Sequence, residues 1–205
     1  MAYRIRGTCF ALLILAFFAG ESANSLFAEQ PKSDAPQYPL QVLIIRHAEK
    51  PPEDTNSVHL SAEGVKRAEA LHQLFEASKN RPAPFPTPDF IFAAKDSKQS
   101  HRPVETVTEA AKKLKLPIDS RFPNDDFAGL VQELFQNSKY ADKTILICWH
   151  HGTAPQLAKR LQAADAPASW KGTVYDRVWE ISYDATGRAT FRDRPQQLLA
   201  TDSAK

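Results

Sequence analysis

Two segments of this chain end an apolar run with basic, ionisable side chains. Ile44-Ile45 is followed by Arg46-His47, and Ile147-Cys148-Trp149 is followed by His150-His151-Gly152. An arginine presents a planar fork of donors that matches phosphate oxygens, and a neutral imidazole can attack phosphorus as a nucleophile. If the two segments meet in one site, their side chains suit the transfer of a phosphoryl group.

A third basic residue, Arg102, directly precedes Pro103, which suits the first position of a helix. Helix N-termini carry unpaired amides and positive potential, so a guanidinium there is well placed to bind an anion. Gly152 lets an anion approach the backbone, and His151 can stabilise charge on the transferring group. Each residue alone more often has a structural role, such as an ion pair or a strand-end histidine. Only their combination favours a phosphate site.

The order of predicted elements can position these residues together. Strands are predicted over 40–45, 89–94 and 144–149, which are short, continuous apolar runs. Helices are predicted over 61–78, 103–116, 127–135 and 155–161, followed by a β-hairpin from 174–183 and 189–192. This order indicates an α/β fold, a three-layer αβα sandwich with a mostly parallel central sheet. Ligands of such sheets bind beyond the carboxyl ends of the strands, where both histidine motifs fall.

The helix over 61–78 has the clearest signals. Ser61 is a good N-cap, and Glu63 lies in the first turn, where the helix dipole favours an anion. Val65, Ala68 and Phe75 recur at helical spacing and are predicted to form the buried face.

Four motifs in this order resemble the histidine phosphatase superfamily, with its phosphoglycerate mutase-like fold. Arg46-His47-Ala48 resembles the family's Arg-His-Gly signature, with alanine in place of glycine, and 60–71 resembles its following helix start. Ser100-His101-Arg102-Pro103 resembles the stretch that carries its second phosphate-binding arginine, and 149–152 resembles its second histidine motif. The resemblance covers about 40–199, and the Arg-His-Ala-Glu-Lys form is most similar to small bacterial phosphatases.

The resemblance implies a two-step phosphoryl transfer. His47 would attack the phosphorylated substrate, a small molecule or a phosphoprotein, and form a phosphohistidine that water hydrolyses. Arg46, Arg102 and His151 would hold the phosphate oxygens and compensate their charge. No metal and no organic cofactor is implied.

The chain departs from the family pattern at the general acid. Family members often use a carboxylate on a mid-chain insertion, and the candidates here are Asp96, Asp125 and Asp126, none of which lies in a recognisable motif. His150 stands where a small residue or a glutamate is expected and is a fourth candidate. Alternation along a strand would, however, point its side chain away from that of His151. Glu49, two residues after His47, is interpreted as part of an ion pair.

The N-terminus has the pattern of a secretory signal. Arg4 and Arg6 precede an apolar stretch from Cys9 to Ala19, and small residues follow. The domain organisation is therefore a signal peptide over 1–28, a linker over 29–39, the catalytic domain over 40–199 and a flexible tail over 200–205. A secreted or periplasmic location is expected, without stable membrane association after cleavage. Cys148 would be the one cysteine left and is interpreted as a buried apolar residue.

Composition narrows the possible partners. The formal net charge is +2, and the basic residues form no stripe, which argues against a nucleic-acid partner. The sequence leaves the oligomeric state and the substrate open.

Three alternatives to a general phosphatase remain open from the sequence. The first is a metal site on His47, His150 and His151, which no obvious carboxylate accompanies. The second is a non-catalytic phosphate- or phosphoprotein-binding domain, which the absent acid would explain. The third is a phosphohistidine-specific phosphatase, since a leaving imidazole needs little help from an acid. A mutase is disfavoured by the short chain and the export signal.

Overall fold

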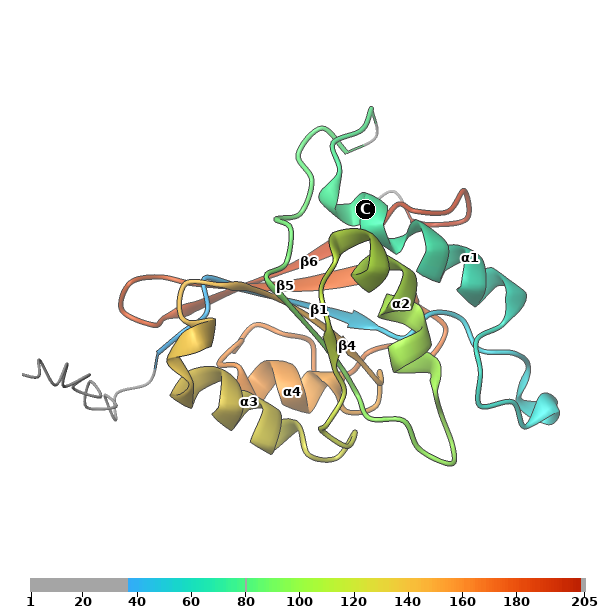
Figure 1. The fold of residues 1–205 in the computed structure, drawn as a ribbon, viewed down its shortest axis with the longest axis horizontal. Coiled ribbons are helices and arrows are strands. Elements are labelled where there is room, and N and C mark those ends of the chain that lie inside the picture. Colours follow the sequence, from blue (N-terminus) through green and yellow to red (C-terminus); the bar gives the residue numbers. More distant parts are fainter. Residues whose placement is uncertain (1–36, 80, 204–205) are drawn as a thin grey trace, which may run out of the picture. The chain divides into compact units, whose positions relative to one another are not determined.

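The computed structural model describes residues 37–79 and 81–203. The expected signal peptide and most of the linker lie outside these residues. The described part is built on a six-stranded sheet in the order β3-β2-β4-β1-β5-β6 (Figure 1). The strands are β1 (Gln41–Arg46), β2 (Phe90–Ala93), β3 (Ile118–Asp119), β4 (Thr144–Trp149), β5 (Arg177–Tyr183) and β6 (Ala189–Pro195).

Four of these strands form the parallel part of the sheet. β1 and β2 both pair in parallel with β4, and β3 pairs in parallel with β2. β5 adds antiparallel to β1, and β6 adds antiparallel to β5 as the predicted hairpin. Every residue of β1 and β4 is buried, because these central strands are covered on both faces. The prediction of a mostly parallel sheet is confirmed.

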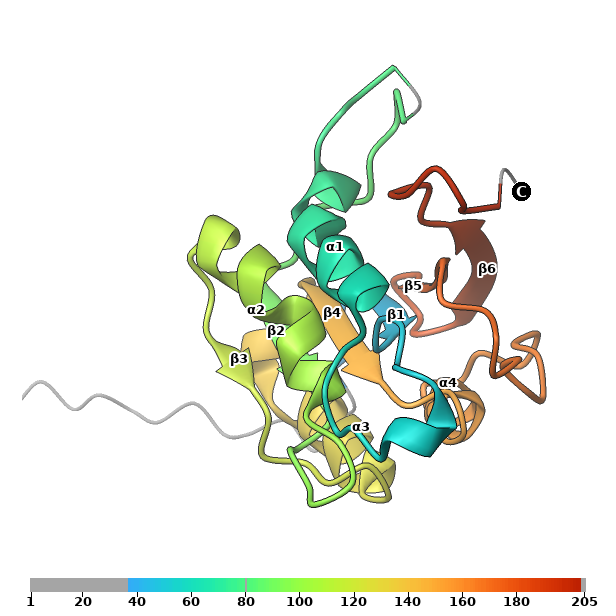
Figure 2. The ribbon, with the colours of Figure 1, turned by 90° about the vertical axis from the view of Figure 1, so that its right-hand side faces the viewer.

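Helices cover both faces of the sheet. α1 (Ala62–Ala70), its 3₁₀ extension η2 (Leu71–Phe75) and α2 (Arg102–Leu114) lie on one face, and α3 (Phe127–Gln136) and α4 (Ala154–Arg160) lie on the other (Figure 2). Two further 3₁₀ turns, η1 (Glu53–Thr55) and η3 (Ser138–Tyr140), lie in the connections. The three-layer αβα arrangement predicted from the sequence is therefore confirmed.

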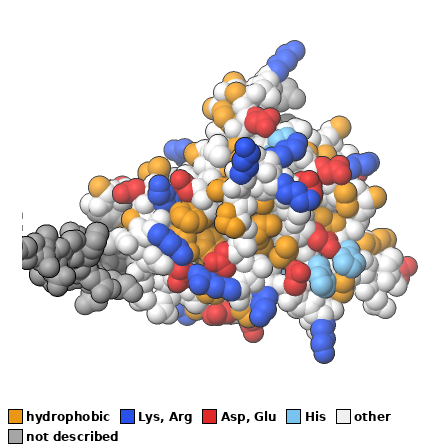
Figure 3. Space-filling model, in the orientation of Figure 1, with side chains coloured by type: hydrophobic (Ala, Val, Ile, Leu, Met, Phe, Trp, Pro, Cys, Tyr) orange, Lys and Arg blue, Asp and Glu red, His pale blue; other side chains and the backbone are white. Residues whose placement is uncertain are grey.

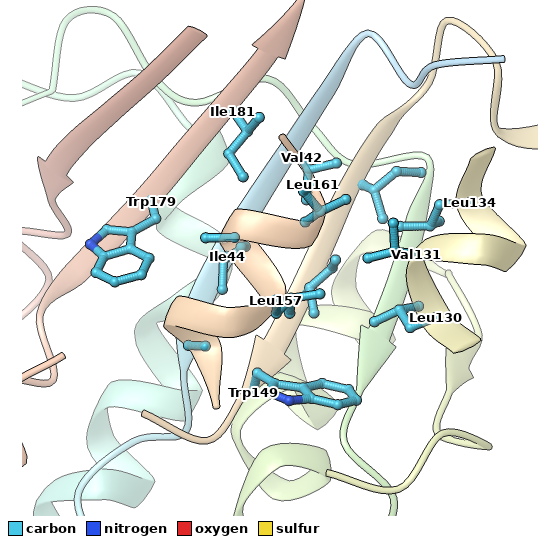
Figure 4. Packing of buried hydrophobic residues seen from close by; sticks show 14 of the residues in the cluster. Val42, Ile44, Leu130, Val131, Leu134, Trp149, Leu157, Leu161, Trp179 and Ile181 are labelled. Atoms are coloured by element: carbon cyan, nitrogen blue, oxygen red, sulfur yellow. The ribbon is translucent and has the colours of Figure 1, made fainter. Parts of the chain in front are cut away.

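Two apolar clusters hold the layers together. One lies under α3 and α4, where Leu130, Leu134 and Leu157 pack on Ile44 and Trp149 of the central strands (Figure 4). The other lies under η2 and α2, on the opposite sides of the same strands. Alternate residues of β1 therefore belong to different clusters. A shift of the strand by one residue would move every side chain to the other face, so the pairing register of β1 is fixed.

The start of α1 follows the predicted capping but not the predicted buried face. The backbone N–H of Gly64 donates to the Ser61 hydroxyl at 3.1 Å. Val65, predicted to be buried, is 45% exposed, so that part of the prediction is wrong. Ala68 is buried as predicted, and the η2 residues Leu71, Leu74 and Phe75 join the apolar cluster on the sheet. The helical segment ends at Phe75 rather than at residue 78, because Glu76 adopts an extended backbone.

The shortest strand, β3, has no counterpart in the predictions. It has only two residues, which is too few to show a strand period. No helix among the described residues is long and apolar enough to cross a bilayer.

Candidate active site

The three basic motifs meet at one edge of the sheet. β1 and β4 are neighbours whose last residues, Arg46 and Trp149, lie opposite each other. The backbone N–H of His47 continues the ladder by donating to the Trp149 carbonyl at 3.0 Å. Arg102 begins α2, which follows β2, the other neighbour of β4. The parallel sheet therefore brings together the carboxyl ends that carry Arg46, His47, Arg102 and His151, as predicted.

His47 is buried, and its tautomer is fixed by the backbone. Its Nδ1 lies 2.7 Å from the Ala48 carbonyl oxygen, which can only accept, so Nδ1 carries the proton. Nε2 is then left with its lone pair. Burial, followed by the charges of Arg46, His150 and Arg102, lowers the pKa of His47 to about 2. The ring is therefore neutral and nucleophilic at Nε2 throughout the physiological range.

Arg46 is anchored along one side of its guanidinium. Nη1 donates to the carbonyl oxygens of Gly172 at 2.9 Å and Val174 at 3.0 Å, and the group lies 3.9 Å from the centre of the Tyr175 ring. Nη2 donates to Nδ1 of His151 at 3.1 Å. Nε is buried and has no hydrogen-bond partner among the described residues.

His151 has the opposite tautomer to His47. An arginine can only donate, so His151 Nδ1 accepts from Arg46 and the ring proton lies on Nε2. Burial, together with Arg46 and Lys50, lowers the pKa of His151. The neutral ring can thus donate from Nε2 to a phosphate oxygen while His47 attacks.

Arg102 forms hydrogen bonds with the loop before α1 and with the first turn of its own helix. Its Nη1 donates to the Ser57 carbonyl at 3.0 Å, while its Nε is buried without a partner among the described residues. The Thr106 hydroxyl donates to the Arg102 carbonyl at 2.7 Å and accepts from the Ala48 N–H at 2.8 Å. This hydroxyl links the first turn of α2 to the segment that carries His47.

His150 lies closer to the site than the sequence predicted. β4 ends at Trp149, so strict alternation no longer applies at the next residue. The His150 ring is 5.2 Å from the His47 ring, edge to face. Alternation would point the His150 side chain away from His151, but the ring lies against His47 instead of in apolar packing or open solvent.

The three aspartates proposed as general acids have other contacts or positions. Asp96 pairs with His101 at 3.1 Å on the surface. Asp126 caps α3, where its carboxylate accepts from the Gly129 N–H at 3.0 Å. Asp125 is exposed in the turn before that helix. Asp96 and Asp126 are therefore engaged by other residues, and none of the three carboxylates forms a hydrogen bond or ion pair with His47 among the described residues.

A further carboxylate near the site, Glu49, has a structural partner. It accepts from Nε of Arg67 at 2.9 Å and from Nη2 at 2.7 Å, a bidentate ion pair. Arg67 also donates to Asp202 at 2.7 Å. The interpretation of Glu49 as part of an ion pair is confirmed. Asp202, assigned by sequence to the tail, joins the same pair with a side chain only 2% exposed.

Tyr175 is a site residue that sequence reasoning missed. Its ring stacks on the Arg46 guanidinium and lies 6.2 Å from the His47 ring. Tyr175 precedes β5 in a loop without periodicity, and no motif marks it. The hydroxyl bridge from Thr106 to Ala48 could not be inferred from sequence either.

Two further histidines lie at the rim of the site. His59 pairs with Glu105 and His101 pairs with Asp96, and the two imidazole rings lie 5.2 Å apart. Figure 3 shows histidine side chains exposed beside acidic ones on this face. Each of these two histidines therefore has a carboxylate partner beside it.

The alternative metal site is not formed. Within residues 37–79 and 81–203, no three histidine, cysteine or acidic side chains are placed to hold a metal ion. Cys148 is fully buried, and burial raises the pKa of its thiol. The interpretation of Cys148 as an apolar core residue is confirmed.

Comparisons with known proteins agree with this fold. The structure of the protein histidine phosphatase SixA complexed with tungstate matches with a TM-score of 0.54 and 16% identity, covering 76% of this chain and 97% of that one. A phosphoglycerate mutase from Plasmodium falciparum matches with a TM-score of 0.50 and 15% identity, covering 80% and 95%. Neither protein-family models nor curated protein sequences give a match. The chain therefore has the phosphoglycerate mutase-like fold of histidine phosphatases, as the motifs implied.

Proposed function

We propose that this chain is a histidine phosphatase that hydrolyses phosphate monoesters or phosphohistidine through a phosphohistidine intermediate on His47. The observation that carries the proposal is that Arg46, Arg102 and His151 converge on the buried, neutral imidazole of His47 at one edge of the sheet. Two cationic donors beside a neutral nucleophilic imidazole suit a phosphoryl group.

The geometry supports a division of roles. His47 attacks phosphorus through Nε2, because Nδ1 is engaged by the Ala48 carbonyl. His151 donates from Nε2 to a phosphate oxygen, because its Nδ1 accepts from Arg46. The two arginines carry the compensating positive charge as the bond to the leaving group breaks. Water then attacks the phosphohistidine and releases phosphate.

Turnover of a panel of substrates tests this proposal. We expect phosphate release from an aryl phosphate and from a phosphohistidine peptide, with no loss of rate in the presence of a chelator. His47→Ala should abolish release, because no other group replaces the nucleophile. An acid-labile phosphoenzyme should form on wild-type protein and be absent from the variant. Normal turnover by His47→Ala would refute the mechanism, and phosphate binding without turnover would indicate a binding domain.

We propose further that the protein is exported to a secreted or periplasmic location. The apolar stretch after Arg4 and Arg6 is the feature that supports this proposal. N-terminal sequencing of the protein recovered outside the cytoplasm should find a start near residue 29. Recovery of the intact N-terminus from the cytoplasm would contradict it.

A further inference from the structure

Cleavage of an alkyl phosphate ester requires a proton for the departing oxygen. Two of the candidate aspartates have other partners, because Asp96 pairs with His101 and Asp126 caps α3. Glu105, in the first turn of α2, is also engaged, because its carboxylate accepts from His59 and from the Leu60 N–H at 2.9 Å. These contacts direct attention to the imidazoles of the site. The need for such a donor rests on the proposed phosphatase function.

His150 is held in the site by its backbone. The carbonyl of His150 accepts from the Thr153 N–H at 3.1 Å and the Ala154 N–H at 2.9 Å, which fixes the turn into α4. This turn directs the side chain toward His47, with 5.2 Å between the ring centres and a 67° angle between the planes. Both imidazoles are thus within reach of one phosphate ester bound at the end of β1.

Among the described residues, His150 is the one histidine whose two ring nitrogens both lack a hydrogen bond to a protein atom. The other five histidines all use Nδ1 in a hydrogen bond with a protein atom: His47, His59, His72, His101 and His151. The ring nitrogens of His150 make no such bond within the part of the chain that the structure describes. A half-buried imidazole without a protein partner can exchange a proton with a ligand.

The charges around His150 couple its protonation to the substrate. Burial lowers the pKa of His150 to about 4, with Arg102, His151 and Arg46 adding to the effect. The neighbouring imidazole of His47 is neutral. A bound phosphate places negative charge among these same groups and so favours the protonated imidazole. The substrate itself thereby brings His150 into its acidic form.

We propose that His150 is the general acid of the first step and the general base of the second. In the first step a bond forms between His47 Nε2 and phosphorus, the bond from phosphorus to the ester oxygen breaks, and the His150 proton passes to that oxygen. In the second step neutral His150 takes a proton from water as its oxygen bonds to phosphorus. The bond to His47 Nε2 then breaks, and both histidines return to their initial state.

A leaving-group series on a His150→Gln variant tests this role. For alkyl phosphates, kcat/KM should fall about 100-fold or more, which is the usual contribution of a general acid. For an aryl phosphate with a good leaving group and for a phosphohistidine peptide, kcat/KM should change by less than about fivefold, because these groups leave without an acid. With the aryl substrate the variant should also show a burst of the released phenol followed by slower turnover, since the base of the second step is absent.

Two controls separate this inference from the phosphatase function itself. His101→Gln, at the rim, should leave the dependence on leaving group unchanged, and His47→Ala should lose all substrates. Equal loss of kcat/KM on every substrate by His150→Gln would assign it to phosphate binding and overturn the role as acid. Unchanged activity of His150→Gln on alkyl phosphates would also overturn the role as acid. Absence of turnover by wild-type protein would instead remove the proposed function.

Discussion

His47 and His151 differ in function because their Nδ1 atoms contact groups of opposite kind. A carbonyl oxygen faces His47 and an arginine N–H faces His151, so the first ring presents a lone pair at Nε2 and the second presents a proton. Neither assignment requires a charged imidazole. The site therefore acquires a nucleophile and a hydrogen-bond donor from the same residue type through local contacts alone.

The buried, neutral state of His47 predicts that acid destabilises the fold. The folded pKa is about 2, below the value of about 6.5 for an unfolded histidine, so the unfolded state binds more protons between these values. Stability should fall as pH decreases through this window, by up to about 1.4 kcal/mol per pH unit for this group. Urea unfolding of wild type and His47→Gln at about pH 6 and about pH 4.5 should show a weaker pH dependence in the variant.

Tyr175 should act by positioning Arg46. Its ring stacks on the guanidinium in a partly desolvated setting, where such a contact contributes about 1–2 kcal/mol. Tyr175→Leu should therefore weaken the binding of inorganic phosphate, measured by calorimetry, about tenfold. Tyr175→Phe keeps the aromatic face and should bind within about twofold of wild type. Equal loss in both variants would show that the hydroxyl, rather than the stacking, matters.

The sequence predicted the residues whose chemistry is visible in their type and missed those that act through geometry. Arg46, His47, Arg102 and His151 follow apolar runs or precede a proline, so their places at strand ends and a helix start could be inferred. Tyr175 contacts Arg46 from more than 100 positions along the chain, and no local pattern encodes that contact. The orientation of His150 depends on where β4 stops, which a period-two pattern cannot locate to one residue.

At the scale of elements, Gly64 near the start of α1 sets how closely that helix approaches the segment that follows His47. A Cβ on Gly64 would lie 2.3 Å from the Glu49 carbonyl oxygen, and the Ser61 N–H donates to that same oxygen at 2.9 Å. The clash is with backbone, which cannot rotate away. Glu49 follows His47 by two residues, so any displacement is transmitted to the segment that carries the nucleophile.

Gly64→Ala should therefore destabilise the protein by about 1–3 kcal/mol, the usual cost of overpacking. Thermal unfolding followed by circular dichroism measures this loss. Gly152→Ala is a matched control for stability, because a Cβ there meets no atom within 4 Å. A melting temperature of Gly64→Ala equal to that of Gly152→Ala would show that α1 can shift without cost.

The elements themselves were predictable where burial on both faces produces continuous apolar runs. β4 was placed over the same residues, 144–149, and β1 was shifted by one. Amphipathic spacing was less reliable at Val65, which lies in the first turn of α1 with its side chain directed to solvent. Capping residues locate the start of that helix, but they do not determine which side faces the sheet.

At the scale of the whole molecule, the end of the described chain is bound to the segment that follows the nucleophile. Arg67 of α1 is buried between Glu49 and Asp202, and these hydrogen bonds raise its pKa despite its burial. Asp202 also accepts from the backbone N–H of Leu198 at 2.8 Å. Residues far apart in sequence thus converge on one buried guanidinium, which has two carboxylate partners.

Removal of Asp202 should therefore cost far more than its position near the chain end suggests. Asp202→Ala leaves the buried Arg67 guanidinium paired with Glu49 but removes the acceptor of two of its N–H groups, and a buried donor left without its partner costs about 1–3 kcal/mol. Truncation after Ala200 should lower the free energy of unfolding, measured with urea, by a similar amount. Glu109→Ala, which breaks an exposed pair with Lys112, should change it by less than about 1 kcal/mol. If truncation has as little effect as Glu109→Ala, residues 200–205 are the flexible tail that the sequence predicted.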